Sequence, residues 1–122
     1  MKLTEITINT DSLVNILTRA ITKSLTIDQL FCEIYTTKVI TNDNINIYNI
    51  QFRLYTLDPE PGTSRQYISA QKALDDKVIN VKKMRRMLDK LFRNNKEESL
   101  GTFKLGVNDF STFYLTLRMI KQ

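Results

Sequence analysis

Hydrophobic and polar positions alternate along the middle of the chain as they do in β-strands. Between residues 48 and 55 the apolar side chains Tyr48, Ile50, Phe52 and Leu54 are interleaved with Asn49, Gln51, Arg53 and Tyr55. Successive side chains of a strand point to opposite faces, so this segment is predicted to be a strand with one buried and one exposed face. Residues 31–40 are rich in β-branched and aromatic types and predict a partner strand, with a polar turn at residues 41–44 between the two.

The C-terminal segment repeats this alternation. Apolar residues recur at every second position in 103–107 and again in 113–119, and Asn108 and Asp109 between them are typical turn residues. This pattern predicts a hairpin whose outward face carries Lys104, Tyr114, Thr116 and Arg118. Residues 66–69 predict a further short strand. The two prolines and the glycine in residues 58–62 exclude a strand there and predict a loop, which, beside Arg65, is a candidate mobile flap.

Two other segments have helical periodicity. The first begins at Thr10 or Asp11 and ends near Ser24, and it follows a short strand predicted at residues 3–8. Residues 80–94 predict a second helix, because Val81, Met84, Leu88 and Leu91 recur at spacings of three and four. Residues 70–79 fit either the start of that helix or a connection.

The order of these elements indicates an α+β fold. Residues 30–120 run strand, strand, short strand, helix, strand, strand, an order that resembles the OB fold, a five-stranded barrel that often binds oligonucleotides. We therefore predict one domain over residues 1–122, with an OB-like antiparallel barrel in 29–122 and an N-terminal strand-helix extension in 1–28. The alternative is a winged-helix-like domain, with helix 80–94 as recognition helix and residues 101–119 as wing. The two long central strands favour the barrel.

The positive charge of the chain is concentrated in one segment. The net charge is +5, yet residues 77–96 alone hold eight basic side chains and one acidic, a net +7, and the remainder holds ten basic and twelve acidic, a net −2. On the predicted helix, five cations fall opposite the apolar stripe: Lys82, Lys83, Arg86, Lys90 and Arg93. A merely solvated face is the alternative interpretation, but such faces usually mix both signs of charge.

Composition argues against catalysis. The chain has no histidine, one cysteine and three glycines, which excludes His-dependent triads, the common zinc sites and Gly-rich phosphate loops. Cys32 lies among apolar neighbours and is expected to be a buried, inert thiol. We therefore expect no catalytic residue, no cofactor and no metal site, and a small carboxylate-dependent metal enzyme is the least favoured function.

Cations among exposed aromatic rings indicate nucleic acid as the partner. Bases stack on the rings while the cations contact phosphates, and neither interaction requires a particular sequence. The expected binding residues are Arg53, Tyr55, Arg65, Lys82, Lys83, Arg86, Lys90, Arg93, Lys104, Tyr114 and Arg118. The leading hypothesis is a sequence-tolerant single-stranded DNA-binding protein of phage or mobile-element replication.

Two other binding functions stay open. One is a small protein-binding inhibitor or assembly factor that uses the basic helix, and the other is a winged-helix protein that binds duplex DNA. The choice between DNA and RNA and a homo-oligomeric state also stay open. No apolar run approaches the ~20 residues of a membrane helix, so we expect a cytoplasmic protein with no membrane partner.

Overall fold

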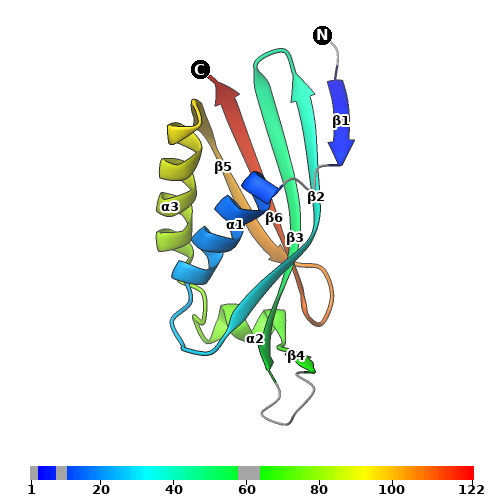
Figure 1. The fold of residues 1–122 in the computed structure, drawn as a ribbon, viewed down its shortest axis with the longest axis vertical. Coiled ribbons are helices and arrows are strands. Elements are labelled where there is room, and N and C mark those ends of the chain that lie inside the picture. Colours follow the sequence, from blue (N-terminus) through cyan, green and yellow to red (C-terminus); the bar gives the residue numbers. More distant parts are fainter. Residues whose placement is uncertain (1–2, 8–10, 58–63) are drawn as a thin grey trace.

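The computed structural model describes residues 3–7, 11–57 and 64–122, and within them the chain forms an α+β fold (Figure 1). The predicted flap at residues 58–62 lies outside the described residues. The elements are β1 (Leu3–Thr7), α1 (Asp11–Lys23), β2 (Phe31–Asn42), β3 (Ile45–Leu57), β4 (Arg65–Tyr67), α2 (Ala70–Asp75), α3 (Val81–Asn94), β5 (Glu97–Val107) and β6 (Thr112–Lys121). The predicted strands and both predicted helices are therefore present, with a short helix, α2, where the prediction was ambiguous.

The strands form one open antiparallel sheet of order β1-β2-β3-β6-β5, and β4 pairs with the end of β3. The predicted OB-like barrel is wrong, because the sheet does not close: β1 occupies the outer edge of β2, and helices cover one face. The winged-helix alternative is wrong as well. β6 lies between β3 and β5 inside the sheet, so the C-terminal hairpin is part of the core rather than a projecting wing.

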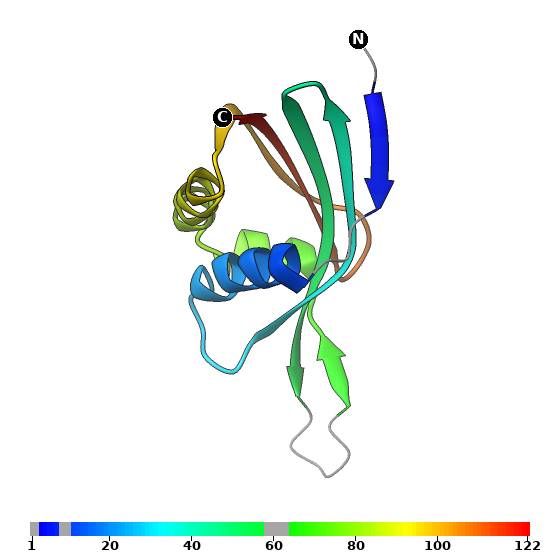
Figure 2. The same ribbon diagram turned by 45° about the horizontal axis from the view of Figure 1, so that its top comes forward.

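Within residues 3–7, 11–57 and 64–122, the helices cover one face of the sheet, and the core lies between the helices and that face (Figure 2). Figure 2 shows α1 (blue) and α3 (yellow) on the same side of the strands. Leu17 and Ile21 of α1 are fully buried with Leu88 of α3 against Phe52 and Phe113 of the sheet, whose rings stack at a centroid distance of 4.8 Å. α1, which lies in the segment expected as an extension, thus supplies part of the same core.

Local capping sets the limits of α3. The Asn80 side chain accepts a hydrogen bond from the backbone N–H of Lys83 at 3.0 Å, and the Asn95 side chain donates to the Leu91 carbonyl at 2.9 Å. These bonds satisfy backbone groups that a helix end leaves without partners. Met84, Leu88 and Phe92 of α3 are buried as the periodicity predicts, whereas Val81, assigned to the same stripe, is 38% exposed.

Candidate nucleic-acid interface

No helix of the described residues covers the second face of the sheet (Figure 2), and we call it the open face. Residues paired across antiparallel strands share a face, and the register aligns Lys38, Asn49, Thr116 and Lys104 in one row across β2, β3, β6 and β5. The predicted strand-face residues lie on this face: Arg53 and Tyr55 on β3, Lys104 on β5, Tyr114 and Arg118 on β6. The sequence alternation therefore identified the exposed sides of β3, β5 and β6 correctly.

One end of the open face carries a cluster of arginines and aromatic rings. We call it the aromatic-arginine cluster, and its members are Phe31, Tyr35, Arg53, Tyr55, Arg65 and Tyr67. The guanidinium carbon of Arg53 lies 4.6 Å from the centroid of Tyr35 and 5.2 Å from that of Tyr67. Arg65 lies 4.4 Å over Tyr55. These distances are within the range of cation–π attraction, which also fixes the orientation of both side chains.

Glu33 of β2 connects two members of this cluster, Tyr67 and Arg65. Its carboxylate accepts a hydrogen bond from the Tyr67 hydroxyl at 2.5 Å and lies 3.4 Å from a guanidinium nitrogen of Arg65. The Nε of Arg53 is buried and has no hydrogen-bond partner among the described residues. The side chains of the cluster are therefore held in place before a ligand binds. The Nε–H of Arg53 remains available as a hydrogen-bond donor.

The aromatic side chains that are exposed to a ligand differ from those that the sequence predicted. Tyr55, expected to stack bases, is half-buried between Phe31, whose ring stacks on it at 5.6 Å, and the cation of Arg65. Phe31 and Tyr35 are each 40% exposed. Sequence reasoning missed both, although the aromatic enrichment of residues 31–40 was the signal that could have found them.

A polar hollow of about 290 Å³ lies at the middle of the open face, and Lys38, Asn49, Gln51, Tyr114 and Thr116 are among its lining residues. The side-chain oxygen of Asn49 accepts from the Thr116 hydroxyl at 3.3 Å, and that of Gln51 accepts from the Tyr35 hydroxyl at 2.5 Å. No hydrogen bond within the described residues uses either amide NH₂ group. Both amides can therefore donate to a ligand in the hollow.

Tyr114 is positioned by a glycine on the neighbouring strand. Gly106 is its direct partner in the β5–β6 pairing, and a Cβ at Gly106 would meet the Tyr114 ring at 2.3 Å. The ring therefore occupies the space that a side chain at residue 106 would take. An aromatic side chain over a cross-strand glycine covers backbone that would otherwise be bare.

The basic helix residues lie on the other side of the molecule. Lys82, Lys83, Arg86, Lys90 and Arg93 are exposed on α3, as predicted, and we call them the α3 ridge. Since α3 packs its opposite side on the helix-covered face of the sheet, the ridge faces away from the open face (Figure 2). The predicted site residues thus form two separate surfaces rather than one. Arg65 belongs to the surface that contains Arg53 and Tyr55.

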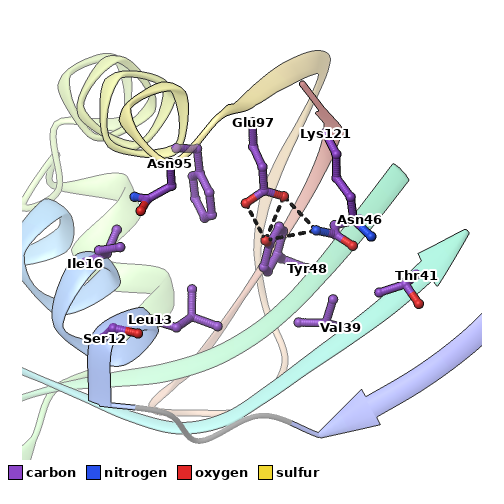
Figure 3. Close-up of a pocket in the computed structure, with 11 residues that line it drawn as sticks. Ser12, Leu13, Ile16, Val39, Thr41, Asn46, Tyr48, Asn95, Glu97 and Lys121 are labelled. Carbon is purple, nitrogen blue, oxygen red and sulfur yellow. Dashed lines mark hydrogen bonds between the residues drawn. The ribbon is translucent and has the colours of Figure 1, made fainter. Parts of the chain in front are cut away.

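A pocket of about 360 Å³ lies between α1, the end of α3 and the sheet, and Figure 3 shows its polar centre. The Glu97 carboxylate accepts from the Tyr48 hydroxyl at 2.7 and 2.8 Å and from the Asn46 amide at 2.7 Å. Burial, together with the Glu97 carboxylate, raises the pKa of Tyr48 above its ordinary range. These bonds link β5 to β3 across β6, so Glu97 acts as a structural link that no sequence motif indicated.

Other candidate chemistry is sparse within the described part of the chain. Cys32, expected to be buried, is half-buried. This burial, with a smaller contribution from the Glu33 charge, raises the pKa of its thiol to about 12, so the thiol stays protonated at neutral pH. Among the described residues, no three His, Cys, Asp or Glu side chains are grouped closely enough to hold a metal ion. No helix in these residues has the length and apolar character needed to span a membrane.

Comparison with known proteins adds no family: the chain matches no family model, no curated protein and no solved structure.

Proposed function

We propose that the open face binds single-stranded nucleic acid with little sequence preference, and that single-stranded DNA is its ligand. The observation that carries this proposal is the combination of exposed aromatic rings, cations and unused amide donors on a sheet face that no helix covers. The basic residues on this face are Lys38, Arg53, Arg65, Lys104 and Arg118, and the acidic ones are Glu5, Glu33 and Glu98.

Each group on the face has a role in this proposal. Phe31, Tyr35 and Tyr114 offer rings on which bases stack, a contact that contributes ~1–3 kcal/mol per base. Lys104 and Arg118 are exposed, have no ion-pair partner among the described residues, and contact phosphates. Lys38 already lies 3.3 Å from Glu5, so it contributes less.

The geometry favours a single strand over a duplex. In a duplex the bases are stacked on one another and their faces are inaccessible, whereas a single strand can turn them onto the rings of the protein. The hollow with Asn49 and Gln51 then receives polar base edges or phosphates without requiring one base. From Tyr55 to Ile47 the face extends for about 27 Å at ~3.4 Å per strand residue.

The test is fluorescence anisotropy with labelled oligonucleotides. Wild-type protein should bind a poly-pyrimidine single strand at least about tenfold more tightly than a duplex of the same length, because only unpaired bases can stack. The double variant Tyr35→Ala, Tyr114→Ala should lose affinity at every salt concentration. Ile27→Ala is the matched control, since Ile27 is an exposed apolar residue in the connection before β2, off the open face.

Two results would refute the proposal. One is duplex binding as tight as single-strand binding, and the other is an unchanged affinity in a double tyrosine variant that is folded by circular dichroism.

A further inference from the structure

The α3 ridge is a regular array of cations. Lys82, Arg86 and Lys90 follow one another at four-residue spacing, about 6 Å along the axis at ~1.5 Å per residue. At ~100° per residue, the ridge is confined to an arc of about 100° centred opposite the buried Met84 and Leu88. The ridge therefore points directly away from the core.

The N-terminal part of this array opposes the stability of the helix that carries it, whereas Arg93 lies in the last turn, where the helix dipole favours positive charge. Lys82 and Lys83 lie in the first turn, where the helix dipole disfavours positive charge, and that turn contains no acidic residue. Arg86 repels Lys82 and Lys90 at spacings of four, where like charges each cost a few tenths of a kcal/mol. No ridge residue has an ion-pair partner within the described ranges. A bound polyanion would relieve all of these repulsions at once.

The ridge and the open face cannot serve one short strand. The sheet and the core lie between them, so a strand bound to Arg118 and Tyr114 would have to pass around an edge of the sheet to reach Arg86. Two cationic surfaces on opposite sides can instead hold two different segments of nucleic acid.

We propose that the α3 ridge is a second nucleic-acid contact and that one molecule of this protein bridges two strands. This inference rests on the proposed function of the open face. The ridge has no exposed aromatic side chain, so it binds the phosphate backbone, by charge alone, and the open face holds the other strand by stacking. Joining two strands on one protein raises their effective concentration toward each other, which favours annealing of complementary strands.

The experiment mixes two short, non-complementary single strands, one with a donor and one with an acceptor fluorophore. Wild-type protein should produce energy transfer at low salt. The ridge variant Arg86→Gln, Lys90→Gln, Arg93→Gln should lose most of it, yet bind one labelled strand within a few-fold of wild type. Lys23→Gln, Lys72→Gln, Lys77→Gln removes the same charge from outside the ridge and should bridge normally. Loss of three phosphate contacts should also flatten the log–log salt dependence of bridging by about 2, at ~0.7 per contact.

The outcomes separate the two proposals. Wild-type binding of one strand without energy transfer would overturn bridging and leave the open face as a binding site. Energy transfer that persists in the folded ridge variant would also overturn it, because the strands would then meet through association of protein molecules. No binding of any oligonucleotide would refute both proposals and leave an acidic protein as the partner of the ridge.

Discussion

Gly106→Ala tests the placement of Tyr114 on the open face. The new Cβ would lie 2.3 Å from the ring, whereas ordinary contact begins at 3.4 Å, so the ring must move by at least about 1.1 Å. No hydrogen bond within the described residues holds the Tyr114 hydroxyl, and the ring lies on a face without helices. The ring can therefore swing aside, and we expect a stability loss below ~1 kcal/mol, less than a tightly packed core would show.

The expected effect on binding is larger than the effect on stability. A base stacked on Tyr114 contributes ~1–3 kcal/mol, which corresponds to an affinity change of about 5- to 150-fold. Moving the ring should remove a large part of this stacking free energy. The affinity of the Gly106→Ala variant should therefore approach that of the Tyr114→Ala variant. In the Tyr114→Ala background the same glycine substitution should have no further effect, because nothing remains for the methyl group to displace.

Gly101→Ala is the matched control on the same strand. Gly101 has φ +87° and no atom within 4 Å of its Cβ position, so alanine there strains the backbone without touching a neighbour. It should cost ~1 kcal/mol of stability and leave affinity unchanged. Urea unfolding and anisotropy titration of the single and double variants measure both quantities. If Tyr114→Ala weakens binding while Gly106→Ala does not, Gly106 does not control the ring.

Three further predictions concern the core and its titratable groups. Phe52→Ala and Leu88→Ala, both at fully buried positions, should each destabilise by ~2–5 kcal/mol in urea unfolding, and losses below about 0.5 kcal/mol at both sites would show that the faces are misassigned. At pH 8 the Cys32 thiol should react with iodoacetamide about a thousandfold more slowly in the folded than in the unfolded protein, because its pKa is raised from 9.0 to about 12, and equal rates would contradict its burial. Folding keeps Tyr48 protonated above its ordinary pKa of 10.0, so stability should fall as pH rises past 10, by at most ~1.4 kcal/mol per pH unit. Tyr48→Phe should reduce that decline, and an identical decline in both proteins would exclude Tyr48 as its source.

The sequence alone determined which way most side chains of β3, β6 and α3 point. Alternation in β3 and β6 separated Phe52 from Arg53 and Phe113 from Tyr114, and helical spacing separated Leu88 from Arg86, because these periodicities are properties of the local backbone. The existence of the long strands and of both long helices followed from the same patterns, although β5 begins at Glu97, six residues before the predicted strand.

Beyond the two strand pairs that the turns predicted, β2 with β3 and β5 with β6, only the tertiary structure decided which elements are neighbours. The aromatic-arginine cluster depends on the register that pairs Phe31, Tyr55 and Tyr67 across three successive strands. The Glu97 link to Tyr48 likewise crosses an intervening strand. Periodicity carries no information about strand partners, since any exposed face looks alike in a single segment. For the same reason, the sequence could not reveal that the sheet stays open or that the α3 ridge and the open face lie on opposite sides.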